Sequence, residues 1–162
     1  MAKKSLPMTP AVRYLKEKGI DFKPHTFKYE EKGGTRQSAQ ELGVDEHNVI
    51  KTLVFETDSG TPIIILMHGD IEVSEKELAR QLTVKSINPV NEKKAMKLTG
   101  YQFGGTSPFG TKQKIETYAE ETIFALDKIY INCGKRGFLA EMMPSDIEKA
   151  IDVKKVNVGI KK

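Results

Sequence analysis

Cysteine is nearly absent from this chain, which has Cys133 alone among 162 residues. A single cysteine excludes an internal disulfide framework and is typical of proteins in a reducing compartment, so we expect a cytoplasmic location. Long hydrophobic runs are also missing. The longest, Ile63 to Met67, is far too short to cross a bilayer, and the N-terminus has no apolar signal segment, so we expect no membrane association.

A strong excess of either charge is absent as well. The net charge is +4 and the isoelectric point about 9.0, with lysines gathered in short clusters along the chain: Lys3-Lys4, Lys93-Lys94, Lys112 with Lys114, Lys135-Arg136, Lys154-Lys155 and Lys161-Lys162. A polyanionic partner such as RNA fits this charge, and so does an ordinary soluble surface. Hydrophobic residues make up 38% and charged residues 30%, which is typical of a folded domain, and we expect one domain over residues 1–162.

The motifs of common enzyme classes are missing. Ser107 lacks the closing glycine of a nucleophile elbow, and the glycines match neither a dinucleotide-binding nor a phosphate-binding loop. The three histidines, His25, His47 and His68, lack paired metal-ligand spacing. We therefore expect no cofactor and no metal. Cys133 could be a nucleophile whose pKa the neighbouring basic residues lower, although packing is the commoner role of a cysteine at a strand end.

Helical and extended segments alternate along the chain. Several strand pairs are joined too tightly for crossover helices, so we predict an α+β fold with helices packed around a mixed, largely antiparallel, curved sheet. The predicted helices start at Thr9-Pro10 and at the capping box Ser74–Glu77, and cover 35–42, 91–98 and 144–150. The predicted strands cover 22–29, 49–55, 62–68, 84–88, 114–119, 128–133, 138–142 and 153–160.

Lys51 interrupts an apolar strand, Val49-Ile50-Lys51-Thr52-Leu53-Val54-Phe55. Alternate side chains of a strand share a face, so Lys51 shares its face with Val49, Leu53 and Phe55. Burying an ammonium without a partner is costly. The lysine therefore lies at a sheet edge, meets a carboxylate, or lines a pocket where it acts on a ligand.

The segment Gly104-Gly105-Thr106-Ser107-Pro108-Phe109-Gly110 is the second unusual feature. Three glycines and a proline within seven residues fix an uncommon backbone path and let a ligand approach the main chain. Exposed N–H groups in such a loop can hold a carbonyl or an oxyanion. A plain tight connection between strands is the alternative.

Together these segments resemble the YbaK family of aminoacyl-tRNA deacylases, which is related to the editing domain of bacterial prolyl-tRNA synthetases. The resemblance rests on the order and spacing of Thr9-Pro10-Ala11, His25-Thr26-Phe27, Val49-Ile50-Lys51-Thr52-Leu53, Thr99-Gly100-Tyr101, the loop 104–110 and Gly134-Lys135-Arg136-Gly137. It covers the chain from about residue 9 to the C-terminal helix.

The resemblance implies an enzyme that clears mischarged tRNA(Pro) in trans, with Cys-tRNA(Pro) as the substrate. Lys51 matches the family's essential lysine and would orient the ester, while N–H groups near Gly104 and Gly105 would stabilise the oxyanion. The cysteinyl thiol of the substrate would attack its own ester, so no protein nucleophile is needed. The predicted substrate-binding residues are Phe27, Thr52, Gly104, Gly105, Thr106, Ser107, Gly110, Asn132, Gly134 and Leu139.

Three positions depart from the cysteinyl-specific pattern. Phe27 replaces a tyrosine, Asn132 a serine and Leu139 an aspartate. A small apolar pocket would favour alanine instead, and a bound water would then be the nucleophile. A catalytically inactive module that binds tRNA or protein is the remaining alternative. The expected partners are mischarged tRNA and, as a further candidate, prolyl-tRNA synthetase.

Overall fold

The computed structural model describes residues 6–161, so Lys3, Lys4 and Lys162 of the lysine clusters lie outside the described residues. The helices are α1 (Pro10–Glu17), α2 (Gly34–Leu42), α3 (Glu75–Leu82), α4 (Glu92–Thr99) and α5 (Ser145–Ala150), with 3-10 turns η1 (Glu46–Asn48) and η2 (Glu121–Ala125). The strands are β1 (Lys23–Thr26), β2 (Val49–Thr57), β3 (Pro62–His68), β4 (Ile71–Val73), β5 (Ile87–Pro89), β6 (Glu116–Glu120), β7 (Ile129–Lys135), β8 (Phe138–Met142), β9 (Val153–Val156) and β10 (Gly159–Lys161). None of the helices in the described range is both long and apolar enough to cross a membrane.

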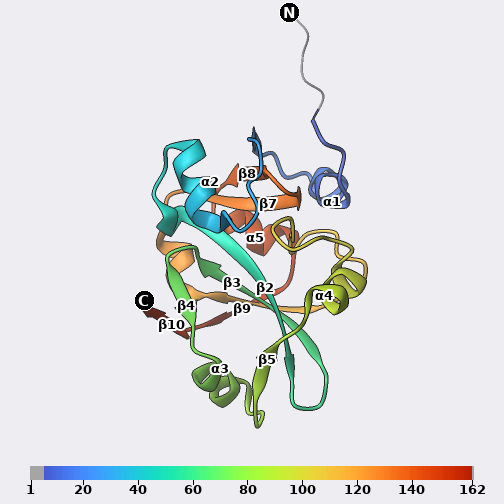
Figure 1. The fold of residues 1–162 in the computed structure, drawn as a ribbon, viewed down its shortest axis with the longest axis vertical. Helices are drawn as coiled ribbons and strands as arrows, with labels where there is room; N and C mark the ends of the chain where they lie inside the picture. Colours follow the sequence, from blue (N-terminus) through green and yellow to red (C-terminus); the bar gives the residue numbers. More distant parts are fainter. Residues whose placement is uncertain (1–5, 162) are drawn as a thin grey trace, which may run out of the picture.

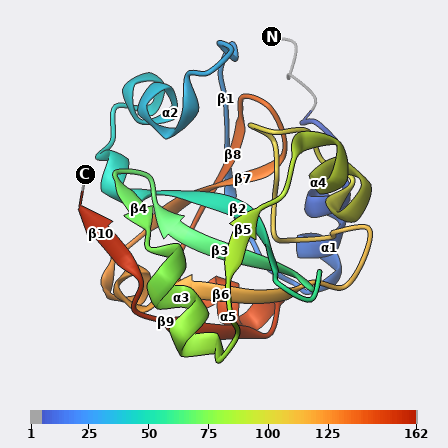
Figure 2. The same ribbon diagram turned by 60° about the horizontal axis from the view of Figure 1, so that its bottom comes forward.

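The main sheet confirms the mixed α+β prediction. Its strand order is β1-β8-β7-β2-β3-β6-β9, and β5 adds to β2 outside this path (Figures 1 and 2). Pairing is antiparallel for β1 with β8, β8 with β7, and β2 with β3 and β5, whereas β2 with β7, β3 with β6, and β6 with β9 are parallel. A separate small sheet pairs β4 with β10.

Helices cover both faces of the sheet. On β3, Ile64 and Leu66 belong to a core shared with α1, α4 and α5, whereas Ile63, Ile65 and Met67 belong to a core shared with α3. Burial on both faces explains why β3 is a continuous apolar run without polar alternation. In both ribbon views α2 lies on the opposite side of the molecule from α1 and α4 (Figures 1 and 2).

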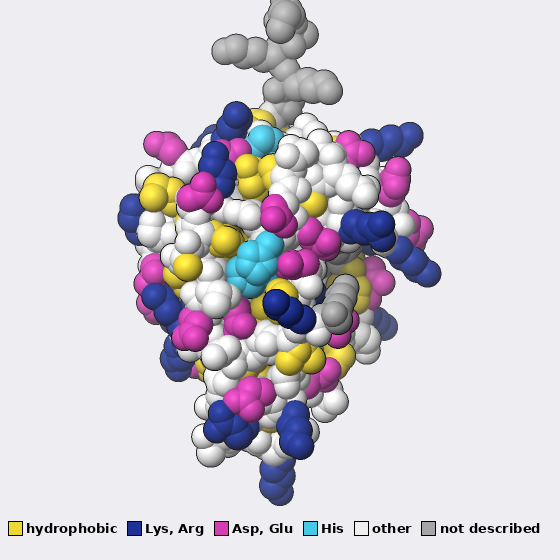
Figure 3. Space-filling model, turned by 90° about the vertical axis from the view of Figure 1, so that its left-hand side faces the viewer, with side chains coloured by type: hydrophobic (Ala, Val, Ile, Leu, Met, Phe, Trp, Pro, Cys, Tyr) yellow, Lys and Arg dark blue, Asp and Glu magenta, His cyan; other side chains and the backbone are white. Residues whose placement is uncertain are grey.

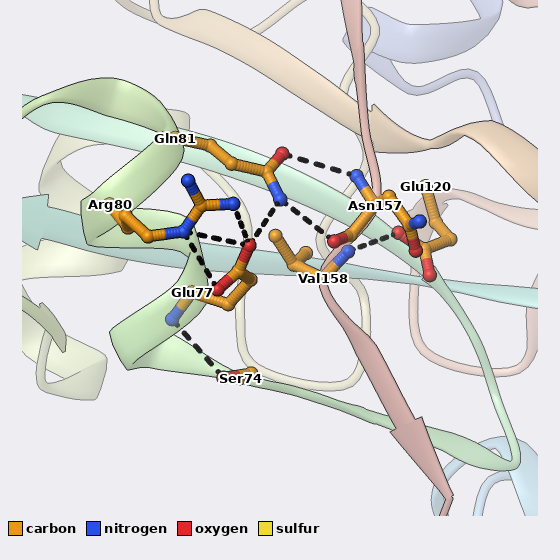
Figure 4. Close-up of polar contacts among 7 residues, drawn as sticks. All are labelled: Ser74, Glu77, Arg80, Gln81, Glu120, Asn157 and Val158. Atoms are coloured by element: carbon orange, nitrogen blue, oxygen red, sulfur yellow. Dashed lines mark hydrogen bonds and ion pairs between the residues drawn. The ribbon is translucent and has the colours of Figure 1, made fainter.

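Both helix starts predicted from the sequence are confirmed. Thr9 caps α1 and accepts a hydrogen bond from the Val12 N–H, and Ser74 caps α3 by accepting one from the Glu77 N–H. The reciprocal half of the capping box is not formed. The Ser74 N–H donates to the Val158 carbonyl, and the Glu77 carboxylate is held by Arg80 and Gln81 (Figure 4).

A buried carboxylate holds the C-terminal segment in place by hydrogen bonds. Glu120 accepts a hydrogen bond from the Val158 N–H at 2.7 Å (Figure 4) and another from the Gly159 N–H at 2.8 Å. The Gln81 side-chain amide donates to the Asn157 carbonyl. The predicted strand 153–160 is therefore two strands, because Val156 ends the pairing with β6 and Gly159 starts the pairing with β4.

Several other strand ends differ from the prediction by one or two residues, and two strands differ for reasons that their pairing explains. The strand expected over 22–29 pairs only from Lys23 to Thr26, because its partner β8 begins at Phe138, opposite Thr26. The strand expected over 84–88 forms at Ile87–Pro89, where the end of β2 offers a free edge. The short strand β4 was missed, because three residues give too little alternation for a pattern.

Candidate functional site

A cleft of about 740 Å³ opens where β2 and β7 diverge. These strands pair in parallel only at Val49 with Tyr130 and Ile50 with Ile131, and β5 joins β2 from Phe55 onward. Between these two pairings, Lys51, Thr52 and Leu53 line the cleft. The open edge of an interior strand therefore forms the wall of the site.

Lys51 lines this cleft and is half-buried. Its strand lies between β7 and β3 in the sheet order, so Lys51 is not on an outer strand; it lies on the stretch of β2 that β7 has left open. The Lys51 ammonium donates a hydrogen bond of 3.4 Å to the Gly69 carbonyl, which also lies 3.2 Å from the Thr35 hydroxyl. The same hydroxyl lies 2.7 Å from a Glu46 carboxylate oxygen. The lysine thus sits beside a polar group formed by α2, η1 and the β3–β4 turn.

Thr52 lines the cleft and has a polar side-chain atom without a partner among the described residues. Its hydroxyl oxygen is buried and has no hydrogen-bond partner within the described part of the chain. Val54 accepts from the Val90 N–H on the β5 side of β2, whereas Val49 accepts from the Gly69 N–H on the β3 side. Because main-chain polar groups alternate along a strand, the N–H and C=O of Thr52 point to the open edge of β2. A buried unsatisfied polar atom of this kind marks a place for a ligand or water.

An apolar part of the lining comes from Phe27, Leu53 and Leu139. Leu139 is 3% exposed and lies opposite Asn132 in the β7–β8 ladder. The Asn132 amide nitrogen donates to the Gly104 carbonyl at 2.8 Å, and its oxygen accepts from the Gly134 N–H at 2.8 Å. The Asn132 amide is thus used to hold the neighbouring loop.

The glycine loop enters the site at its first turn. The Gly105 N–H donates to the Gln102 carbonyl, and Gly104 has a φ of +84°, so residues 102–105 form a turn that requires glycine at its third position. The uncommon backbone path is therefore confirmed. The Gly105 N–H is not available to an oxyanion, contrary to expectation, because the turn already uses it.

The predicted site residues separate into two groups. The cleft brings together Lys51, Phe27, Thr52, Gly104, Thr106, Asn132 and Leu139. Its lining does not include Gly105, Ser107, Gly110 or Gly134.

These four support the site by packing. A Cβ on Gly110 would lie 2.6 Å from the Pro10 carbonyl oxygen, and one on Gly134 would lie 2.8 Å from the Tyr101 ring. One on Gly105 would lie 2.9 Å from the Arg136 nitrogen. Ser107 is fully buried and accepts from the Phe109 N–H. The placement of the loop against α1 and the β7–β8 turn explains these residues without substrate contact.

Cys133 is not equipped as a nucleophile. The residue is fully buried, and burial raises the pKa of its thiol to about 12. The neighbouring basic residues therefore do not lower its pKa, as one of the sequence interpretations required. Packing is the role that the structure supports.

The histidines are held by specific partners. The rings of His47 and His68 stack with their centroids 3.7 Å apart, and His25 contacts Glu141. His68 lies 2.8 Å from the His47 carbonyl and 2.7 Å from the Thr122 hydroxyl, and burial lowers its pKa. Within residues 6–161 no group of three or more His, Cys, Asp or Glu side chains could hold a metal ion.

Charged side chains around the cleft are of both signs. Lys32, Arg36 and Arg136 line it together with Glu31, Glu46 and Glu92. Figure 3 shows one face of the molecule, on which acidic and basic side chains are likewise interspersed. Neither the cleft rim nor this face is therefore uniformly basic.

Sequence reasoning missed several residues that support the site. Gly69 accepts from the Lys51 ammonium, and Thr35 links Gly69 to Glu46, through contacts between segments far apart in sequence. Gln37 is 7% exposed and binds the Lys28 carbonyl and the Glu30 N–H, which fixes the strand-to-helix connection. The glycine at position 69 was the one hint in the sequence, since glycine permits close approach; a Cβ there would lie 2.7 Å from Thr35.

The chain is similar to known proteins over most of its length. Residues 30–150 match the model of the aminoacyl-tRNA editing domain. A candidate Cys-tRNA(Pro)/Cys-tRNA(Cys) deacylase of Enterococcus faecalis, EbsC, is 30% identical over 146 residues, which cover 90% of this chain and 89% of that protein. A proline–tRNA ligase of Ligilactobacillus salivarius is 28% identical over 125 residues, which cover 75% of this chain but 22% of the ligase.

Solved structures share the fold. The hypothetical protein APE2540 superimposes with a TM-score of 0.85 at 20% identity, covering 93% of this chain and 99% of the other. A candidate trans-editing enzyme for prolyl tRNA synthetase gives a TM-score of 0.82 at 18% identity, covering 96% and 99%. Because the family model spans most of the sequence and EbsC is similar over nearly all of it, this chain belongs to the aminoacyl-tRNA editing domain family, the YbaK family.

Proposed function

We propose that the chain is a trans-acting deacylase that releases cysteine from mischarged Cys-tRNA(Pro). An aminoacyl-tRNA editing and deacylase activity is supported by its family. The observation that carries the proposal is the Lys51 ammonium on the wall of a cleft whose lining includes neither cysteine nor histidine. Such a site can orient and polarise an ester but has no conventional protein nucleophile of those types.

The chemistry is assigned to the substrate. The cysteinyl thiol loses its proton and its sulfur attacks the ester carbonyl, forming a C–S bond. The bond between the carbonyl carbon and the ribose oxygen then breaks, and that oxygen takes up the proton. A strained thiolactone leaves, and water opens it to free cysteine. Holding thiol and ester together in the cleft gives the intramolecular reaction its advantage.

Lys51 would stabilise charge on the ester, and Thr52 would bind the aminoacyl group. The ammonium favours the negative charge that develops on the carbonyl oxygen, in place of the Gly105 N–H that the sequence suggested. The unpartnered Thr52 hydroxyl and the main chain of Thr52 would bind the polar atoms of the aminoacyl group. Phe27 and Leu139 would contact its side chain. Gly104, Thr106 and Asn132 would form the opposite wall.

Alanine is the second candidate side chain, and a specific observation favours it. The Asn132 amide is already used by Gly104 and Gly134, and the nearby Phe27 and Leu139 are apolar. A small apolar side chain would fit such a lining. Substrate-thiol attack is then impossible, and a bound water must attack the ester.

Mischarged tRNA is the proposed partner, and prolyl-tRNA synthetase is a second one that would supply tRNA(Pro) selectivity. The proposed setting is the cytoplasm, where translation uses these tRNAs. The proposed catalytic unit is one editing domain.

Release of the amino acid from Cys-tRNA(Pro) and Ala-tRNA(Pro) tests the proposal. We expect faster release of cysteine, and release that slows sharply when the cysteinyl sulfur is methylated. Equal cleavage of the free and methylated forms would overturn the thiol mechanism. Preferred release of alanine would favour the water mechanism. Binding of tRNA without turnover of either substrate would favour the inactive module.

A further inference from the structure

Phe103 is an exposed aromatic ring at the mouth of the cleft. Its exposed fraction is 41%, and it is the one aromatic among the exposed large hydrophobic side chains of residues 6–161. It also lines the cleft, next to Gly104. A single exposed apolar residue needs no explanation by itself. Its backbone, however, is held unusually firmly.

Phe103 occupies the second position of the turn over residues 102–105, a corner position. Its carbonyl accepts a hydrogen bond of 2.7 Å from the Arg136 Nε, and the next carbonyl, of Gly104, accepts one of 2.8 Å from the Asn132 amide. The donors of both hydrogen bonds, Asn132 and Arg136, lie near the end of β7 and in the turn that follows it. The main chain is thus fixed while the ring stays in solvent, which reduces the ordering cost of stacking a ligand on it.

Arg136 brings a cation to the same turn, because its Nε binds the Phe103 carbonyl and its side chain lines the cleft. Its guanidinium lies 4.9 Å from the centre of the Tyr29 ring, and one terminal nitrogen lies 3.8 Å from a Glu92 carboxylate oxygen. Glu92 is 56% exposed, so this ion pair is weak. A guanidinium over an aromatic ring can keep N–H groups at its edge that suit a phosphate.

We propose that Phe103 and Arg136 form a subsite for the 3′-terminal nucleotide of the tRNA acceptor end, with the base stacked on Phe103 and a phosphate at Arg136. This proposal rests on the proposed function, because the ester at Lys51 joins the amino acid to the ribose of that nucleotide. The base must therefore lie near the cleft mouth when the ester is bound. Every base has a π-face, so an exposed aromatic holds it without sequence readout.

Kinetics with mischarged tRNA test the subsite. Stacking on an aromatic is worth about 1–3 kcal/mol, so Phe103→Ala should raise KM roughly 5- to 150-fold with little change in kcat. Phe103→Trp should restore KM. The control is Met96→Ala on α4, a residue of similar exposure at 40% that is not part of the cleft lining. An unchanged KM in Phe103→Ala would overturn the proposal.

Binding separates this proposal from the proposed function. The probe is an uncharged acceptor-stem RNA with or without its 3′-terminal adenosine. Phe103→Ala should weaken binding of the complete RNA only. Equal weakening of both RNAs, or of neither, would overturn the subsite. If wild type deacylates nothing yet shows this dependence on the terminal adenosine, the subsite stands and the proposed function fails.

Discussion

Removing the thiol of Cys133 tests whether the protein supplies its own nucleophile. The side chain is fully buried, and its pKa is raised by burial to about 12, against about 9 for an unperturbed thiol. At pH 7.5 this shift lowers the thiolate fraction about a thousandfold, from roughly 3% to roughly 0.003%. We therefore expect Cys133→Ala to keep turnover of mischarged tRNA within about twofold of wild type.

The cost of this substitution should appear in stability instead. Loss of a buried sulfur leaves a small cavity worth about 1 kcal/mol, which lowers the thermal midpoint by about 2–4 °C for a chain of this size. Iodoacetamide should modify native Cys133 at least about a thousandfold more slowly than the unfolded chain. A loss of turnover above a hundredfold with an unchanged midpoint, or rapid alkylation of native protein, would refute the reasoning.

Two further predictions concern the loop and pH. Gly104→Ala should lower turnover and stability more than Gly60→Ala. Both glycines have a φ of +84°, but only at Gly104 would a Cβ meet Tyr29, at 2.8 Å. Equal thermal midpoints of the two variants would contradict this. Burial lowers the folded-state pKa of His68, so the unfolded chain binds a proton first as the pH drops. The free energy of unfolding should therefore fall below about pH 6.5. Urea titrations between pH 7.5 and 5.5 should show a smaller fall of this free energy in His68→Gln than in wild type.

The order of helices and strands follows from local signals. Thr9-Pro10 and Ser74 satisfy helix N-termini, and the apolar run from Ile63 is buried on both sides, so the pattern predicts these elements correctly. Strand ends depend on partners instead. The strand expected to reach Tyr29 stops at Thr26 because β8 begins opposite that residue.

The candidate site was only partly predictable for a similar reason. Lys51 was visible as an anomaly, because an ammonium in an apolar strand needs a partner or a pocket. The pocket itself arises where β7 leaves β2 and β5 has not yet joined, which is a long-range property. Gly69, which also accepts from Thr35, reaches Lys51 through the same long-range arrangement. Gly110, in contrast, fitted the family pattern but packs on Pro10.

The most direct test of the account is single-turnover deacylation by Lys51→Met, with Lys97→Met as the control. Lys97 is an exposed lysine of α4 that is not part of the cleft lining. The thermal midpoints of both variants are measured alongside, so that a loss of rate can be compared with any loss of folded protein.

Loss of charge stabilisation at the ester should slow Lys51→Met by about 10²- to 10³-fold at saturating Cys-tRNA(Pro). Lys97→Met should match wild type. If Lys51→Met keeps its rate, or loses rate only in proportion to unfolded protein, then Lys51 is a structural residue and does not act on the ester.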